Sequence, residues 1–184
     1  MNTPQTVLPT EKVKESGLRE LLVEQLKDLY SAEIQLAKAL PRMEQAAVSA
    51  ELKEAFRKHL EETKRHAEKL EIILLDLNEK TAGVKCEGME GLVKEGNKLI
   101  KKRERDGEIK DVGLIAAAHR EEHYEIAGYG IARTYARILG LNDAADILQK
   151  TLDEIGDEDK ELTDISDNLL HAAISKEEGV TNEK

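Results

Sequence analysis

The segment LVEQLKDLYSAEIQLAKALPRM, residues 22–43, decides the fold, because its apolar residues recur every three or four positions. This spacing is typical of the inner face of a helix in a bundle. Pro41 predicts a kink in this helix, which we expect to continue to about residue 47. One residue of the stripe is acidic although its position should be buried. The stripe consists of Leu22, Leu26, Leu29, Glu33, Leu36, Leu40 and Met43.

Four further segments continue this pattern along the chain. Residues 51–78, 110–139 and 142–173 predict long helices, and residues 87–104 predict a shorter helix that is weakened by glycines. This order predicts an all-α, ferritin-like four-helix bundle, in which two antiparallel helical hairpins are joined by a long crossover containing the short helix. The predicted boundaries are 1–15 for a flexible N-terminal tail, 16–174 for the bundle and 175–184 for a flexible C-terminal tail.

The composition of the chain excludes several kinds of function. The net charge is −10 and no basic face is clustered, so nucleic acids and anionic membranes are poor partners. No apolar run is long enough to cross a bilayer, and the first residues contain no hydrophobic signal core, so we expect a cytoplasmic protein. Cys86 is the single cysteine, which excludes an iron–sulfur cluster held by several thiolates. Any redox activity would therefore need an external electron donor.

A weak internal repeat relates the two predicted hairpins. Shifting the chain by 92 residues aligns Glu33 with Glu125 and Glu62 with Glu154. The two glutamates of each hairpin are 29 residues apart in both cases. A repeat of this kind places equivalent residues at related positions in space.

These four glutamates lie on or beside the apolar stripes of four different long helices. The stripes face one another in a bundle, so the four side chains should converge. Ionised carboxylates in a dry interior are costly unless they are paired, protonated or bound to cations. Divalent metal ions would satisfy several of them together, because carboxylate oxygens bind and bridge such ions. The alternative is that each glutamate lies at the edge of its stripe and reaches water.

Further candidate ligands lie one helical turn from these glutamates, namely Glu122, His66 and Glu158. The usual carboxylate-bundle pattern places a histidine three residues after a glutamate on each of two helices. Arg65 and Asp157 occupy those positions here, so the predicted ligand set is richer in oxygen. Whether His66, Asp157 or Glu158 completes the set stays open.

Other polar residues on the stripes each have two interpretations. His59 is best explained as a core histidine whose hydrogen bonds are satisfied, although it lies on a stripe. His119 lies one turn before the predicted ligand Glu122, and it either donates a hydrogen bond to that carboxylate or does not interact with it. His123 points to another face of the helix. Tyr30 and Tyr129 lie one turn from predicted ligands, where they either pack in the core or bond to a ligating carboxylate.

A family resemblance rests on Asp28-Leu-Tyr-Ser-Ala-Glu33, His59-Leu-Glu-Glu-Thr63, Cys86-Glu-Gly-Met-Glu-Gly-Leu92, Leu114-Ile-Ala-Ala-Ala118, Glu122-His-Tyr-Glu-Ile-Ala127 with Tyr129-Gly130, and Thr151-Leu-Asp-Glu154. Over about residues 18–172 the chain resembles the bacterial YciE/YciF-like family of ferritin-like proteins. The resemblance implies a dimeric, rubrerythrin-like bundle that is associated with stress responses and holds a carboxylate-rich di-metal centre. The chain departs from the family after Glu154, where Ile155-Gly156 stand in place of Glu-Lys.

We therefore predict two bound metal ions, with iron as the expected metal and manganese or zinc as alternatives. Glu62 and Glu154 are predicted to bridge the ions, with Glu33 and Glu125 as terminal ligands and Glu122 beside them. Such a centre would reduce peroxide or oxygen, or oxidise Fe(II). The alternative is a non-catalytic structural or interaction dimer with a structural or vestigial metal site. Iron storage in a cage is a weaker hypothesis, because the resemblance favours a homodimer.

Overall fold

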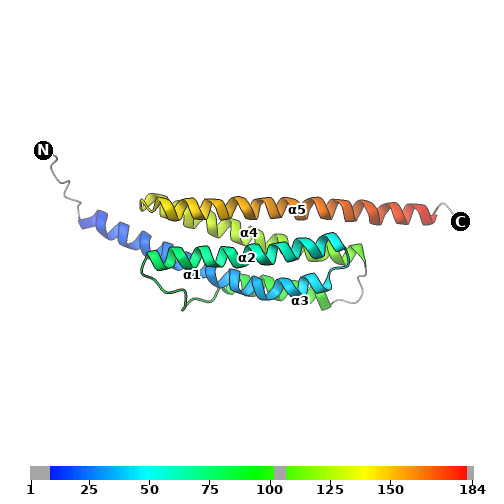
Figure 1. Ribbon diagram of the computed structural model, residues 1–184, viewed down its shortest axis with the longest axis horizontal. Helices are drawn as coiled ribbons and strands as arrows, with labels where there is room; N and C mark the ends of the chain where they lie inside the picture. The colour runs from blue at the N-terminus through cyan, green and yellow to red at the C-terminus, as the bar shows by residue number, and fades with distance from the viewer. Residues whose placement is uncertain (1–8, 102–106, 182–184) are drawn as a thin grey trace.

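The structure, a computed structural model, describes residues 9–101 and 107–181, and every regular element in these ranges is a helix (Figure 1). None of the described helices is long and apolar enough to cross a membrane. The all-α prediction is confirmed, as is the order of two long helices, a short one and two long ones. The helices are α1 (Pro9–Ala46), α2 (Ala50–Asp76), α3 (Glu87–Lys101), α4 (Glu108–Ile138) and α5 (Asn142–Thr181).

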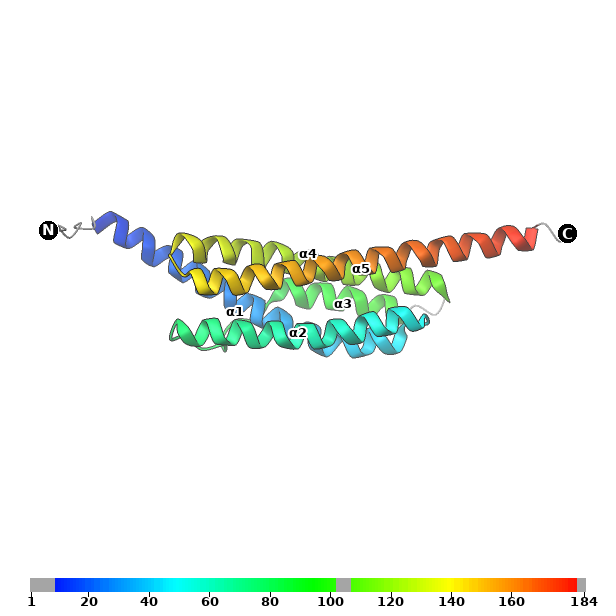
Figure 2. The same ribbon diagram turned by 45° about the horizontal axis from the view of Figure 1, so that its top comes forward.

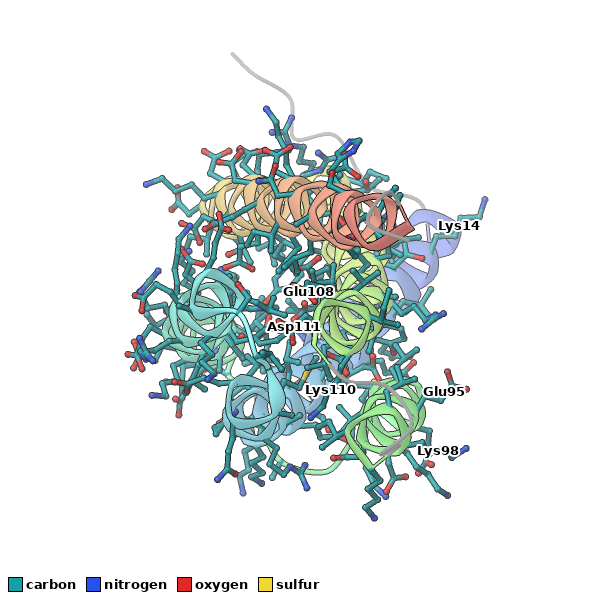
Figure 3. All side chains as sticks on the ribbon, turned by 90° about the vertical axis from the view of Figure 1, so that its right-hand side faces the viewer. Lys14, Glu95, Lys98, Glu108, Lys110 and Asp111 are labelled. Carbon is teal, nitrogen blue, oxygen red and sulfur yellow. The ribbon has the colours of Figure 1, made fainter. Side chains whose placement is uncertain are left out.

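Four of these helices form the bundle, and α3 lies outside it. Figure 2 shows the hairpins of α1 with α2 and of α4 with α5, whose helices run side by side. Viewed along the helices, α1, α2, α4 and α5 surround a common interior, whereas α3 packs on the outside against α1 and α4 (Figure 3). In this view Glu95 and Lys98 of α3 point away from the bundle, and Asp111 of α4 points toward α2. This is the predicted ferritin-like arrangement with a helix in the crossover.

Helices α1 and α5 are longer than the sequence pattern predicts. α1 begins at Pro9 rather than at residue 16, and α5 continues to Thr181 rather than ending near residue 174. Proline suits the first turn of a helix, where its missing N–H is not needed. Both extensions project past the bundle at opposite ends (Figure 1), so no core-facing stripe marks them in the sequence. The predicted tail residues 1–8 and 182–184, and residues 102–104 of the predicted short helix, lie outside the described residues.

Residues in the left-handed conformation end two of the long helices. Asn78 follows α2 with φ of 58°, and Gly140 follows α4 with φ of 71°. After α4 the N–H of Leu141 donates to the carbonyl of Ala136 at 2.9 Å, which caps the last turn. The predicted end of this helix near residue 139 is confirmed, and α5 begins only two residues after Gly140, so the second hairpin is tight.

The bundle core consists of two apolar clusters with a polar layer between them. The first cluster contains α1 residues up to 29 and the second contains α1 residues from 36 onward, each with neighbouring parts of α2, α4 and α5. Between the clusters all four bundle helices contribute acidic or histidine side chains. We call this set the acidic layer, and it consists of Glu33, His59, Glu62, His66, Glu122, Glu125, Glu154 and Glu158.

Asp111 links the two hairpins at the start of α2. Its buried carboxylate accepts hydrogen bonds from the backbone N–H of Val48 at 2.8 Å and of Ser49 at 2.6 Å. The hydroxyl of Ser49 in turn accepts the N–H of Leu52 and caps α2. The turn between α1 and α2 therefore depends on an acceptor that α4 supplies.

Replacing Asp111 by Ala should lower the free energy of unfolding by about 3 kcal/mol, because two backbone N–H groups would lose a charged acceptor in a buried place. Urea denaturation measures the change. The control is Asp146→Ala on α5, whose side chain is 78% exposed and which should change the stability by less than about 0.5 kcal/mol. Equal effects of the two substitutions would contradict the capping role.

Candidate metal centre

Next to the first apolar cluster, the buried carboxyls of Glu33 and Glu125 lie side by side. The hydroxyl of Tyr129 donates a hydrogen bond of 2.5 Å to Glu33 Oε1. The Nδ1 atom of His66 lies 3.8 Å from the same oxygen. Neither oxygen of Glu125 has a hydrogen-bond donor among the described residues, and the neighbouring Glu33 carboxyl can bond to it only while one of the two carries a proton. One carboxyl of the pair is thus oriented by donors, whereas the other faces a second carboxyl.

One turn nearer to the second cluster, His59, Glu122 and Glu158 converge from three helices. Each of them offers one ligand atom, and these atoms lie within 4.8 Å of one another. The Nε2 atom of His59 is 3.5 Å from Glu158 Oε2, and its Nδ1 atom is 3.9 Å from Glu122 Oε1. Together with Glu62 these residues line a cavity of about 10 Å³, which is close to the room that a single water molecule or ion requires.

Glu62 and Glu154 form the outer rim of the acidic layer. The Glu62 side chain is 14% exposed, and its Oε2 atom is buried without a hydrogen-bond partner among the described residues. The Glu154 side chain is 38% exposed and accepts a hydrogen bond of 2.6 Å from Lys69. Its Oε2 atom also lies 2.9 Å from Nε2 of His66. These hydrogen bonds outweigh partial burial and lower the pKa of Glu154, so this carboxylate is already compensated.

Burial raises the pKa values of the innermost carboxyls. The pKa of Glu33 rises to about 8. Burial and the negative charges of Asp159 and Glu121 raise the pKa of Glu122 to about 8. The pKa of Glu125 lies well above its ordinary value because of burial and the adjacent Glu33. These carboxyls therefore hold their protons near neutral pH until a cation stabilises the ionised form.

Burial has the opposite effect on the two histidines of the layer. It lowers the pKa of His59 to about 3 and the pKa of His66 to about 4. Both rings are therefore neutral at pH 7 and have a lone pair for a metal ion. The Nδ1 atom of His59 has no hydrogen-bond partner among the described residues. His59 is thus not the satisfied core histidine that the sequence suggested, and it joins the candidate ligands.

Buried polar atoms without hydrogen bonds provide the test of whether metal ions fit the acidic layer. Native proteins satisfy nearly all of their buried polar atoms, and an isolated buried carboxylate is costly. Here most of the buried atoms without a partner lie in the acidic layer, and the others belong to Thr63, Glu121 and Arg133. Carboxylate oxygens combined with imidazole nitrogens suit iron, manganese or zinc, so the residues fit such ions. The unpartnered atoms of the acidic layer are Glu33 Oε2, His59 Nδ1, Glu62 Oε2 and both oxygens of Glu122, Glu125 and Glu158.

The predicted ligands divide into a buried group and a rim. The idea that each glutamate reaches water is wrong for Glu33 and Glu125, which are fully buried, and it describes only the rim pair. Asp157, the other residue considered, is exposed. The bridging roles assigned to the rim pair stay predictions. The buried group is Glu33, His66, Glu122, Glu125 and Glu158, and the rim pair is Glu62 and Glu154.

The structure decides between the two interpretations of each polar residue that lies one turn from a predicted ligand. Tyr129 bonds to a candidate ligand, as one of its two interpretations predicted. Tyr30 packs against the first apolar cluster, as in the other interpretation. The Nδ1 atom of His119 is hydrogen-bonded to Asp159 at 2.7 Å and lies 3.4 Å from Glu122 Oε2, so its hydrogen bond goes to Asp159 and not to the predicted ligand.

Glu121, which the sequence pattern did not single out, is also buried without a hydrogen-bond partner among the described residues. It faces α3, since a Cβ atom added to Gly96 would lie 3.7 Å from its Oε1 atom. Burial raises its pKa to about 8. The packing of α3 against α4 helps to cover this side chain, and no local sequence signal predicts that contribution.

The comparisons with known proteins agree with this fold. The family described as "Domain of unknown function (DUF892)" matches residues 17–175. YciF of Escherichia coli (strain K12) is 41% identical over 155 residues, which are 84% of this chain and 93% of YciF. The crystal structure of that E. coli stress protein has a TM-score of 0.80 at 40% identity and covers 84% of this chain and 97% of its own.

Two further solved structures share the architecture. YcfI of Rhodopseudomonas palustris, described as a candidate structural protein, has a TM-score of 0.75 at 35% identity, with 79% of this chain and 92% of YcfI covered. A dodecameric thioferritin of Bacteroides fragilis has a TM-score of 0.67 at 16% identity, with 89% of this chain and 98% of that chain covered. The second similarity shows the ferritin-like fold alone.

Replacing Glu122 by Gln should reduce the metal content of the protein, whereas Glu121→Gln should not. The two residues are adjacent on α4 and equally buried, but only Glu122 lies beside His59 and Glu158. Elemental analysis of both variants, purified without chelators, measures the difference. Equal metal content in the two variants would contradict the assignment.

The stability of the metal-free protein should fall as the pH rises from 6.5 to 8. The folded pKa values of Glu33 and Glu122 are about 8, whereas the unfolded values are near 4.5, so unfolding releases protons in this window. His59 and His66 stay neutral in the folded state, and their unfolded rings lose their remaining protons just above pH 6.5, which opposes the trend by less than about 1 kcal/mol.

Added Mn²⁺ should raise the melting temperature more at pH 8 than at pH 6.5, because binding requires ionised carboxylates. Thermal melts with EDTA and with Mn²⁺ at both pH values test both statements. The first statement would be contradicted if the EDTA-treated protein became more stable toward pH 8. The second would be contradicted if added Mn²⁺ did not raise the melting temperature.

Proposed function

This chain belongs to the DUF892 family, and we propose that it is a ferritin-like protein that binds two metal ions in its acidic layer. The observation that carries the proposal is the convergence of buried carboxylate oxygens that have no hydrogen-bond partner among the described residues. Their burial makes ionisation costly, and two divalent cations would remove that cost for all of them together. No other buried cluster in the described part of the chain combines this many potential ligands.

The proposed ligands fall into two sets. His59, Glu122 and Glu158 would hold one ion beside the small cavity, because their ligand atoms already lie within 4.8 Å of one another. Glu33 and Glu125 would hold the second ion, with His66 next to them. The rim residues Glu62 and Glu154 would add carboxylate oxygens to the ions from the outer side of the layer. Iron is the metal that we propose, and manganese and zinc suit the same donors.

Bound iron would supply one-electron redox chemistry toward oxygen, peroxide or further Fe(II). The chain itself would orient the ligands and exclude water. Tyr129 fixes one oxygen of Glu33 by its hydrogen bond, and Lys69 holds the carboxylate of Glu154 at the rim. The two apolar clusters on either side keep the layer dry, which strengthens every interaction between ligand and cation.

Electrons for such chemistry would come from a separate donor. Cys86 is the single cysteine of the chain, and its thiol is buried in a hydrogen-bonded cluster with Asp28 and Tyr124. Burial raises the pKa of Cys86, which makes it a poor thiolate. We propose that this thiol supports the packing of the crossover and takes no part in redox transfer.

A second candidate function is a structural one. YcfI of Rhodopseudomonas palustris, at 35% identity, is described as a candidate structural protein, and YciF of E. coli is described as a stress protein. In this alternative the metal ions would only hold the four helices together. A homodimer and a cytoplasmic location are proposed under both alternatives.

Reaction of the iron-loaded protein separates the two functions. Protein loaded with Fe(II) without oxygen should change its near-ultraviolet absorbance within seconds of mixing with hydrogen peroxide or oxygen, whereas the structural alternative predicts bound iron that does not react. Glu125→Gln should abolish the change, because it removes a buried candidate ligand. Glu68→Gln, at an exposed position on α2, should leave it intact. Stoichiometric iron without any absorbance change would contradict the redox function and favour the structural one.

A further inference from the structure

Two histidines on α4 meet one aspartate of α5 outside the acidic layer. His119 and His123 are four residues apart, so they lie one turn from each other on the same side of the helix. The Nδ1 atom of His119 lies 2.7 Å from Asp159 Oδ1, and the Nε2 atom of His123 lies 3.3 Å from the same oxygen. Two imidazole rings thus converge on one carboxylate oxygen. An ordinary hydrogen-bonded histidine–aspartate pair contains only one ring.

Two of the spacings between these donor atoms resemble those around a bound metal ion. Ligand atoms 2.0–2.1 Å from a tetrahedral metal are roughly 3.3 Å from one another. His123 lies 3.3 Å from Asp159, and His119 lies 3.4 Å from the Oε2 atom of Glu122. The 2.7 Å contact between His119 and Asp159 is a direct hydrogen bond, which a bound ion would replace. Two imidazole donors together with two carboxylate donors suit borderline divalent cations such as Fe²⁺, Zn²⁺ and Co²⁺.

Glu122 connects this cluster to the acidic layer. His119, Glu122 and Asp159 form one group of potential ligands, and His59, Glu122 and Glu158 form the other. The two oxygens of Glu122 point to different groups, with Oε1 at 3.9 Å from His59 and Oε2 at 3.4 Å from His119.

Exposure falls steadily along this line from the surface to the core. The side chain of His123 is 67% exposed, that of Asp159 is 28% exposed and that of His119 is 25% exposed. The Glu122 side chain at the inner end is fully buried. A cation from solvent would therefore meet the histidines first and the shared carboxylate last.

We propose that His119, His123 and Asp159 form an outer site that binds a borderline divalent metal ion and passes it inward through Glu122. Binding at the outer site stands on its own geometry, whereas the transfer step rests on the proposed function. No bond is made or broken apart from metal–ligand bonds, because the ion exchanges one set of ligands for the other. Glu122 would serve both sites in turn, since it offers one oxygen to each.

Cobalt titration of the metal-free chain tests the outer site. Co²⁺ bound by histidine and carboxylate absorbs visible light, so each binding step can be followed. His123→Ala should lose one equivalent of bound Co²⁺ and should fill the remaining sites more slowly than the wild-type chain. The matched control is His171→Ala, an exposed histidine on α5, which should bind Co²⁺ with the wild-type stoichiometry and rate.

Glu125→Gln separates failure of the outer site from failure of the inner centre. This substitution removes an inner ligand that contacts neither histidine of the outer site, so the variant should keep the equivalent of Co²⁺ that His123→Ala loses. If Glu125→Gln keeps the one equivalent of Co²⁺ that His123→Ala loses, the outer site is supported, even if the inner centre of that variant binds no Co²⁺. Unchanged stoichiometry in His123→Ala would overturn the outer site. Loss of one equivalent with an unchanged filling rate would overturn the transfer step.

Discussion

Unpartnered carboxyl groups in the middle of the core are the constraint on which the rest of this structure depends. A buried carboxylate without a counter-charge is among the most unfavourable groups that a folded protein can contain. Glu33, Glu122 and Glu125 are all buried, and burial raises their pKa values. A chain selected for stability alone would place leucine at these positions, so their presence points to a ligand. Divalent cations are the ligands that satisfy oxygen donors from several helices together.

The surrounding architecture holds this layer in place. One apolar cluster lies on each side of it, so the four bundle helices are held together both before and after the carboxyls. Asp111 reaches from α4 to the first turn of α2 and links the two hairpins near one end. The 92-residue repeat explains the symmetry of the layer, because His66 on α2 and Glu158 on α5 also occupy equivalent positions. Two copies of a hairpin thus bring equivalent residues to the same depth in the core.

Local periodicity was enough to predict the four bundle helices and the depth of Glu33 and Glu125, because these residues interrupt otherwise apolar stripes. The burial of Glu121 could not be predicted, since it depends on α3, a helix from the crossover that packs against α4. His59 was misjudged because its missing hydrogen bond becomes visible only when the neighbouring helices are in place. The extensions of α1 and α5 were missed because they project past the bundle, where no core-facing stripe marks them in the sequence.

Anomalous X-ray diffraction from crystals of the chain, purified without chelators and supplied with Fe(II), tests the central claim most directly. The proposed centre predicts two strong peaks inside the acidic layer, roughly 3.5–4 Å apart, with oxygens of Glu122 and Glu125 among the ligands. A weaker third peak beside His123 is expected from the outer site. A layer without peaks, in which the carboxyls bond to one another or to water, would contradict the account.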